Sequence, residues 1–261
     1  MELENSTILI TGGSAGIGLE FAKQLLQVGA NIIITGRDID KLNAAKKKYP
    51  AIHIIQSDIN DVVDIEALYR QIVEQHPGVN IIINNAGIMR SVELEDENVT
   101  LDNVTDEIDT NFSGTIRMIH RFLPHLMAKT SSAIVNVTSG LAYIPFITSP
   151  VYCGTKAGIH VYSEALRVQL KKTSVKVFEV APPKTDKPMQ TAIVETNDKG
   201  VMKIEKVVSI AIKGMLNDTF EINPGLANVM KWMSRIAPRF FTKLINKRIE
   251  EAKMKARRVD G

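Results

Sequence analysis

Short apolar runs alternate with amphipathic segments along most of the chain. The runs are rich in Ile and Val, which is typical of strands buried on both faces of a parallel sheet. We predict such strands at residues 8–11, 31–35, 52–56, 81–83, 134–138, 175–180 and 220–222. Apolar residues at helical spacing predict helices at residues 17–28, 41–48, 61–74, 101–129, 151–171 and 203–216. This alternation indicates an α/β fold with a ligand site at the carboxyl ends of the strands.

The chain is long enough for one sizeable domain. It has 261 residues with 44% apolar content, and no linker or internal repeat divides it. We predict a single catalytic domain at residues 1–225, with residues 226–261 as a helical extension of the same domain. Residues 91–109 are acidic and predict a loop that enters a long helix, in which we expect Pro124 to cause a bend or a restart. Residues 186–200 are polar, as expected of a lid over a substrate.

The extension combines apolar and basic residues. It holds ten Lys or Arg and three Asp or Glu, a net charge of +7, against +3 for the whole chain. Its apolar residues are Met230, Trp232, Met233, Ile236, Phe240, Phe241, Leu244, Ile245 and Ile249. We expect them to pack on their own domain or on a partner subunit, and contact with a membrane surface is the alternative. Nucleic-acid binding is not expected, because a short basic tail carries no motif that reads a groove.

Composition excludes several classes of protein. The single cysteine, Cys153, rules out an intramolecular disulfide and a cysteine-rich metal site. The histidines show no paired metal spacing, so we predict no metal. No apolar run approaches the length of a membrane span, and the first residues are acidic and polar, unlike a signal peptide. We therefore expect the protein in a reducing cytoplasm.

A glycine-rich turn follows the first predicted strand. Residues 7–18 read TILITGGSAGIG, so a strand leads into glycines and then into a helix. Glycine adopts turn angles closed to other residues and lets a ligand approach the backbone. The helix directs its unpaired N–H groups and positive dipole end at the turn, which suits a diphosphate. The turn is a candidate nucleotide cradle, although a tight strand-to-helix connection would look similar, and the missing Lys-Ser/Thr pair argues against a P-loop.

We expect residues after the second and third strands to contact the adenosine half of a dinucleotide. An acidic residue after the second strand would bind the ribose 2′-hydroxyl, whereas Arg37 suits a 2′-phosphate. Arg37 therefore favours NADP(H), while the neighbouring Asp38 leaves NAD(H) open, and an exposed arginine beside the next helix is the alternative. After the third strand, Asp58 can accept from the adenine amino group and Ile59 can cover the ring.

Ser139, Tyr152 and Lys156 are the residues whose pattern points to chemistry. Tyr152 and Lys156 lie one helical turn apart, and Ser139 ends the fifth strand. Tyrosine has a pKa of about 10, and a nearby lysine charge is expected to lower it toward neutral pH. We predict hydride transfer at a carbonyl, in which Tyr152 exchanges the proton, Ser139 holds the oxygen, and Lys156 polarises Tyr152 and holds the nicotinamide ribose. Asn111, in a bent helix, is expected to bind the water that connects Lys156 with solvent.

These motifs together resemble the short-chain dehydrogenase/reductase family. They comprise the glycine-rich turn, the sequence NNAG at residues 84–87, Asn111, Ser139 and the Tyr152-x-x-x-Lys156 pair. The segments GGSAGIGLE and VTSGLA also resemble one particular oxidoreductase of the family. The resemblance implies a single Rossmann-type, doubly wound parallel sheet of about seven strands with helices on both faces. It also implies an NAD(P)(H) cofactor and homodimers or homotetramers built on the long fourth and fifth helices.

The cofactor-binding residues follow from the same motifs. They are Gly12, Ser14, Gly16, Ile17, Gly18, Arg37, Asp58, Ile59, Asn85, Ala86, Gly87, Tyr152, Lys156, Pro182 and Thr185. The sequence departs from the family after the sixth strand, where Pro183 replaces a glycine and Lys187 replaces a threonine. The backbone of Thr185 can still contact the nicotinamide carboxamide, and Lys187 can instead bind the diphosphate.

The leading prediction is an NADP(H)-dependent oxidoreductase that interconverts an alcohol and a carbonyl compound. A catalytically silent sensor or scaffold that keeps the nucleotide fold is the first alternative. The intact Ser139, Tyr152 and Lys156 argue against it, because a sensor has no use for all three. A membrane-associated reductase of a lipid-like carbonyl is the second alternative, and it rests on the C-terminal extension alone. The sequence does not identify the small-molecule substrate.

Overall fold

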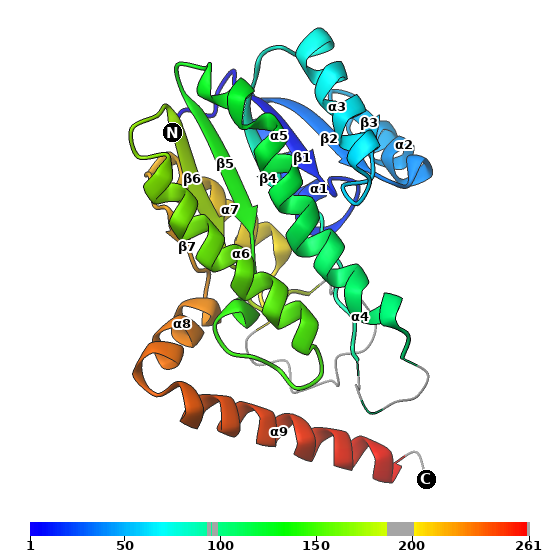
Figure 1. Ribbon diagram of the computed structural model, residues 1–261, viewed down its shortest axis with the longest axis vertical. Coiled ribbons are helices and arrows are strands. Elements are labelled where there is room, and N and C mark those ends of the chain that lie inside the picture. Colours follow the sequence, from blue (N-terminus) through cyan, green and yellow to red (C-terminus); the bar gives the residue numbers. More distant parts are fainter. Residues whose placement is uncertain (93–94, 96–98, 187–200, 260–261) are drawn as a thin grey trace.

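Seven parallel strands form one sheet. The computed structural model describes residues 1–92, 95, 99–186 and 201–259. Its strands are β1 (Thr7–Thr11), β2 (Asn31–Gly36), β3 (His53–Gln56), β4 (Val79–Asn84), β5 (Ser132–Val137), β6 (Val175–Val180) and β7 (Glu221–Ile222). They run in the order β3-β2-β1-β4-β5-β6-β7 (Figure 1). The predicted doubly wound sheet is therefore confirmed.

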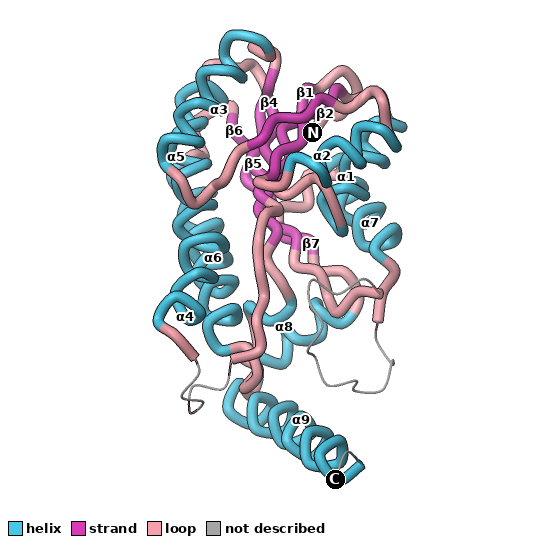
Figure 2. Tube along the Cα trace, turned by 90° about the vertical axis from the view of Figure 1, so that its right-hand side faces the viewer, coloured by secondary structure: helices cyan, strands magenta, loops and turns pink. Residues whose placement is uncertain are grey.

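Helices cover both faces of the sheet. Those of the domain body are α1 (Gly16–Gln27), α2 (Ile39–Lys48), α3 (Val62–Gln75), α4 (Leu101–Ile108), α5 (Thr115–Met127), α6 (Pro150–Gln169) and α7 (Ile204–Leu216). Figure 2 shows α3, α5 and α6 on one side of the strands and α1, α2 and α7 on the other. The chain is thus a three-layer α/β structure.

Alternate residues of each strand face opposite helical layers. On β1, Ile8 and Ile10 belong to a core shared with α1 and α7, whereas Leu9 belongs to a core shared with α3 and α5. All three side chains are fully buried. Because both faces are covered, the three central positions of the strand are all apolar, which explains the continuous runs in the sequence.

The predicted helix at residues 101–129 is divided by a π-helical turn, Asp109–Gly114, between α4 and α5. The wider turn releases backbone carbonyls from the α-helical ladder, and the Thr115 hydroxyl donates to the carbonyl of Asn111 at 3.1 Å. Pro124 lies inside α5, which continues to Met127. The helix therefore does not restart at Pro124, and a bend there stays a prediction, since the irregularity in the backbone pattern is the π turn.

Two helices form the C-terminal extension, α8 (Leu226–Ile236) and α9 (Pro238–Val259). In Figure 1 they extend below the domain body. The first, α8, contacts the body next to Gly140, where Ala227 and Met230 are the nearest side chains. The second is tied to the body by Asn246, which accepts from the Ile147 N–H at 2.9 Å and donates to the Pro145 carbonyl at 3.0 Å.

Part of the apolar stripe of the extension faces outward. Trp232, Ile236 and Phe240 are 60%, 74% and 61% exposed, whereas Ile249 is buried. The extension therefore packs on its own domain in part and leaves an apolar surface uncovered. No described helix combines the length and the hydropathy that a membrane span requires. Of the predicted lid at residues 186–200, only Asp186 lies within the described residues.

Candidate functional site

The candidate site lies where the strand order reverses, between β1 and β4. The chain leaves β1 toward one edge of the sheet and leaves β4 toward the other, so the loops after these strands diverge around a crevice. The glycine-rich turn follows β1, and the NNAG sequence follows β4. Two groups of predicted cofactor residues therefore face each other there.

Glycine is required at different positions of the turn for different physical reasons. Gly16 has a φ of +54° and no neighbour within 4 Å of a Cβ built on it, so its face is open to a ligand. A Cβ on Gly18 would lie 2.5 Å from the carbonyl oxygen of Gly12. The N-cap residue of α1, Ala15, provides no side-chain hydrogen bond, and the first turn of α1 has no acidic residue. Ile17 lies in that turn. An open glycine face before an uncapped helix N-terminus fits a diphosphate.

Asn85 and Thr11 lock the turn to the end of β4. The Asn85 side-chain amide donates to the carbonyls of Thr11 and Gly12 at 3.0 and 3.1 Å. The buried Thr11 hydroxyl in turn accepts from the backbone N–H groups of Asn85 and Ala86, both at 3.1 Å. These contacts of Asn85 and Ala86 thus hold the glycine-rich turn in its shape. The sequence marked Thr11 only as part of a motif, and its hydroxyl at the strand end is the signal for this role.

Arg37 is exposed at the end of β2. The adjacent Asp38 caps α2 by accepting from the Lys41 N–H at 3.1 Å, and its carboxylate pairs with the Lys41 ammonium at 3.0 Å. The Lys41 hydrogen bonds hold the pKa of Asp38 below its usual value. Asp38 is thus engaged within the protein, whereas the Arg37 guanidinium makes no ion pair with the described residues. Ser14 lies close by, its hydroxyl 3.7 Å from a Cβ built on Gly36.

Asp58 and Ile59 follow β3 and are tied to neighbouring elements. The Asp58 carboxylate accepts from the Asn60 N–H at 2.9 Å, and the Asp58 N–H donates to Asp64 at 2.9 Å. Ile59 is only 6% exposed, and it lies 2.9 Å from a Cβ built on Gly114 in the π turn. Contact of these residues with adenine stays a prediction, with little of the Ile59 side chain accessible.

Tyr152 and Ser139 meet next to the end of β5. Tyr152 lies in the first turn of α6, and its side chain is 5% exposed. Ser139 accepts from the Leu141 N–H at 3.1 Å, which fixes the hydroxyl, and it lies close enough to the Tyr152 phenol to act on its pKa. Burial raises the pKa of Tyr152 above its ordinary value, and Ser139 opposes this rise. The structure therefore brings together Ser139 and Tyr152, two of the predicted catalytic residues.

Lys156 is buried beneath Tyr152 on the same helix. Its ammonium donates to the Val137 carbonyl at 2.9 Å and lies 5.7 Å from the centre of the Tyr152 ring. Burial lowers the pKa of Lys156 to about 8. Burial raises the pKa of Tyr152 instead, so the expected lowering toward neutral pH by the Lys156 charge is not met in the protein alone.

Asn111 and Gly87 adjoin Lys156. A Cβ on Gly87 would lie 3.0 Å from the Asn111 oxygen and 3.4 Å from the Lys156 nitrogen. The Asn111 side chain accepts from the Ile88 N–H and donates to the Ile88 carbonyl, both at 2.8 Å, and it donates to the Thr155 hydroxyl at 3.2 Å. Asn111 therefore connects the segment after β4 with the catalytic helix. Its predicted water-binding role stays a prediction.

The segment after β6 carries the departures from the family pattern. The Pro182 carbonyl accepts from the Gly140 N–H at 2.9 Å, so this segment is attached to the residue after Ser139. Thr185 forms a parallel bridge with Met202. Lys187 lies outside the described residues. Nicotinamide contacts of Pro182 and Thr185 stay predictions.

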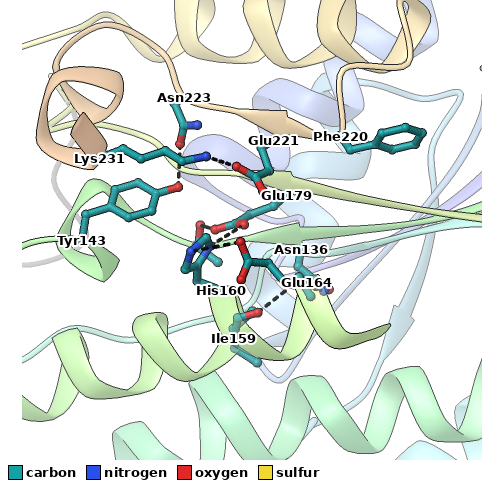
Figure 3. A network of polar contacts seen from close by, with 12 residues as sticks. Asn136, Tyr143, Ile159, His160, Glu164, Glu179, Phe220, Glu221, Asn223 and Lys231 are labelled. Atoms are coloured by element: carbon teal, nitrogen blue, oxygen red, sulfur yellow. Dashed lines mark hydrogen bonds and ion pairs between the residues drawn. The ribbon is translucent and has the colours of Figure 1, made fainter. Parts of the chain in front are cut away.

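A polar network that sequence reasoning missed supports the strand end before Ser139. Glu179 on β6 is 1% exposed, accepts from the Thr138 hydroxyl at 2.7 Å and pairs with His160 at 2.8 Å. Figure 3 shows His160 between Glu179 and Glu164, with Tyr143 directed at Asn223 and Lys231 at Glu221. The histidine had no sequence signal because its carboxylate partner lies on another element. The network joins α6, β6, β7 and α8 behind the site.

Comparison with known protein sequences places the chain among oxidoreductases. A family model described as short chain dehydrogenase matches residues 6–198. The chain is 47% identical over 186 residues to the uncharacterized oxidoreductase DltE of Bacillus subtilis, which covers 71% of this chain and 74% of DltE. It is 32% identical over 190 residues to an uncharacterized oxidoreductase of Staphylococcus epidermidis, covering 72% and 81% of the two chains. DltE is the relative that the segments GGSAGIGLE and VTSGLA resemble, and this resemblance is confirmed.

Solved structures show the same fold. A short chain dehydrogenase from Burkholderia cenocepacia in complex with NADP has a TM-score of 0.80 at 21% identity, covering 95% of this chain and 99% of that one. The 3-ketoacyl-(acyl-carrier-protein) reductase from Brucella melitensis, complexed with NADH, has a TM-score of 0.76 at 24% identity, covering 82% and 91%. At these identities the likeness shows the fold.

The buried Lys156 leads to a prediction about stability. The pKa of Lys156 falls from 10.5 to about 8, so the unfolded chain binds more protons between these pH values. The burial cost is fully present below pH 8 and vanishes above pH 10.5. We expect Lys156→Met to raise the free energy of unfolding at pH 7 by about 2 kcal/mol, after a loss of about 1 kcal/mol for the hydrogen bond to Val137.

Urea unfolding at several pH values measures this effect. The advantage of Lys156→Met should shrink as the pH rises from 8 to 10.5. Lys171→Met, which removes an exposed lysine just after the same helix, serves as the control and should show no such trend. A difference that stays constant over this pH range would contradict the prediction.

Proposed function

Because the chain belongs to the short-chain dehydrogenase family, we propose that it is an NADP(H)-dependent oxidoreductase that interconverts an alcohol and a carbonyl compound. The convergence of Ser139, Tyr152 and Lys156 beside the glycine-rich turn carries this proposal. The Lys156 nitrogen lies 3.4 Å from a Cβ built on Gly87, and Ser139 lies close enough to the Tyr152 phenol to act on its pKa. The catalytic groups and the nucleotide cradle therefore share one crevice.

A bound nicotinamide cofactor would supply hydride to the carbonyl carbon, or accept it from the alcohol. The Tyr152 phenol donates a proton to the carbonyl oxygen during reduction and takes it back during oxidation. The Ser139 hydroxyl donates a hydrogen bond to the same oxygen and holds it beside the phenol. Below its pKa of about 8, Lys156 is a cation close to Tyr152 and stabilises the phenolate that forms. Burial of these groups keeps competing water away from the reacting atoms.

The preference for NADP(H) rests on the surroundings of Arg37. Arg37 is exposed, and its neighbour Asp38, the residue that would favour a ribose hydroxyl, is paired with Lys41. A bidentate arginine suits a 2′-phosphate. This arrangement supports a preference for NADP(H), and we propose that NAD(H) binds more weakly.

The intact catalytic group also separates this proposal from a silent sensor or scaffold. A nucleotide sensor does not need a lysine beside a tyrosine that is buried deeply enough to lower the lysine pKa.

We further propose a cytoplasmic homodimer or homotetramer built on α5 and α6. On α6, Val161 and Val168 lie seven residues apart and are 62% and 74% exposed, which supports this interface.

A pair of fluorescence titrations with NADPH and NADH tests the cofactor. We expect tighter binding of NADPH, and we expect Arg37→Asp to weaken NADPH about tenfold to a hundredfold while NADH binding changes less. Arg70→Asp removes another exposed arginine, on α3, and is the matched control. An unchanged NADPH to NADH ratio in Arg37→Asp would remove the basis for NADP(H), and binding of neither nucleotide would favour the scaffold.

Replacement of Tyr152 tests the chemistry. Tyr152→Phe loses the exchangeable proton, so we expect turnover of a carbonyl panel with NADPH to fall by about a hundredfold or more. Affinity for NADPH should change little. Tyr162→Phe, on the same helix, is the control and should keep its activity. Turnover retained in Tyr152→Phe would show that the catalytic assignment is wrong.

The uncovered stripe supports a second candidate function, reduction of a lipid-like carbonyl at an anionic membrane surface. Trp232, Ile236 and Phe240 are more than half exposed, and Arg235 and Arg239 alternate with them. Exposed aromatic and aliphatic side chains beside cations are typical of helices that lie on anionic bilayers. Because α8 packs beside Gly140, such contact would bring the bilayer close to Ser139.

Vesicle flotation separates the two candidates. We expect a membrane-acting enzyme to float with phosphatidylglycerol vesicles, and the triple variant Trp232→Ser, Ile236→Ser, Phe240→Ser to lose this binding. Phosphatidylcholine vesicles are the control for charge. Equal flotation of the two proteins would remove the second candidate and leave the stripe as a surface between subunits.

A further inference from the structure

Glu179 is a buried carboxylate on β6 that the proposed reaction does not use. Its exposed fraction is 1%. Each of its two oxygens has a partner on another element: Oε1 accepts from the Thr138 hydroxyl at 2.7 Å, and Oε2 lies 2.8 Å from Nδ1 of His160. A carboxylate removed from water is costly unless such contacts compensate for it. These partners therefore indicate what the group does.

Thr138 links this carboxylate to the candidate site, because it directly precedes Ser139 in the chain. It is 3% exposed, and its backbone N–H donates to the Val180 carbonyl at 2.8 Å. The backbone and the side chain of Thr138 are therefore both attached to β6, just after β5 ends at Val137. Together these contacts fix the direction in which the chain leaves the sheet toward Ser139.

The same network holds the chain beyond Ser139. Tyr143, four residues further on, donates its hydroxyl to the Asn223 side chain at 2.7 Å. Its ring lies edge-on to the His160 imidazole, with 5.1 Å between the ring centres. His160 therefore contacts both Glu179 and Tyr143 (Figure 3). The segment that carries Ser139 is thus held at both of its ends by one set of contacts.

We propose that Glu179 is a positioning residue for Ser139, which acts through the Thr138 hydroxyl, and that His160 holds its carboxylate in place. The proposal rests on the proposed function, since Ser139 there holds the substrate oxygen. A group that donates to this oxygen in the transition state must be placed accurately, because a misplacement of about 1 Å can cost about a hundredfold in rate. Contacts that fix the residue before Ser139 therefore act on the rate of the reaction.

Steady-state kinetics of carbonyl reduction test the positioning. Glu179→Leu removes the acceptor for the Thr138 hydroxyl and puts an apolar side chain in place of a buried charge, which proteins often tolerate. We expect kcat to fall about tenfold to a hundredfold, while the KM for NADPH changes little. Glu164 faces the same imidazole at 3.8 Å and its side chain is 43% exposed, so Glu164→Gln is the matched control and should keep the wild-type values. An unchanged kcat in Glu179→Leu would overturn the proposal.

A double-mutant cycle with Ser139→Ala separates positioning from a general structural role. If Glu179 acts through Ser139, Glu179→Leu should lower kcat no further once the Ser139 hydroxyl is absent. A defect that only reduces the amount of folded enzyme would lower kcat by the same factor in both backgrounds, and this result would contradict the proposal. Thr138→Val keeps the shape of Thr138 without its hydroxyl and should give the same pattern, so it decides the cycle where Glu179→Leu does not fold.

Amide hydrogen exchange tests the positioning without substrate. The Leu141 N–H donates to the Ser139 hydroxyl at 3.1 Å, so its exchange rate reports whether this hydroxyl stays in place. We expect Glu179→Leu to speed exchange at Leu141 about tenfold, as for one lost hydrogen bond, and to leave exchange at Ile134 in the centre of β5 unchanged. Wild-type exchange at Leu141 in Glu179→Leu would overturn the proposal. Absence of turnover in the wild type would count against the proposed function alone, since exchange still decides the role of Glu179.

Discussion

The register of three neighbouring parallel strands is the constraint on which the candidate site depends. Ile10 of β1 pairs with Ile83 of β4, and Ile83 pairs with Val135 of β5. These strands therefore end at one level of the sheet, although they lie far apart in the sequence. The glycine-rich turn, the NNAG sequence and Ser139 follow directly from these ends, so the site is assembled wherever the sheet forms.

Burial decides the electrostatics of this site. Lys156 and Tyr152 are 4% and 5% exposed, and desolvation shifts the pKa of each toward the neutral form. The fold bears this cost through contacts that hold the groups in place, among them the Val137 carbonyl for Lys156 and Ser139 for Tyr152. Such a site is stabilised for reaction rather than for folding, as is common where catalytic groups are removed from water.

The polar side chains around the site work by connecting elements. Asn85 ties the glycine-rich turn to β4, Asn111 ties the segment after β4 to α6, and Glu179 ties β6 to α6 through His160. Each is buried or half-buried and hydrogen bonded to backbone or side-chain groups of another element. Because buried polar groups are costly when unpaired, these contacts strongly favour one arrangement of strand ends and helices.

The strands, the order of elements and the family motifs were determined by the sequence alone, because burial on both faces demands apolar runs and a nucleotide turn demands glycine. Tertiary structure decided the rest. Glu107 is an acidic residue in an amphipathic helix, a pattern that predicts exposure, and only tertiary packing buries it. The direction in which the Tyr152 pKa shifts is set by desolvation, which depends on how deeply the packing buries the phenol. Sequence spacing places residues on a face, whereas these energies arise between elements that only folding brings together.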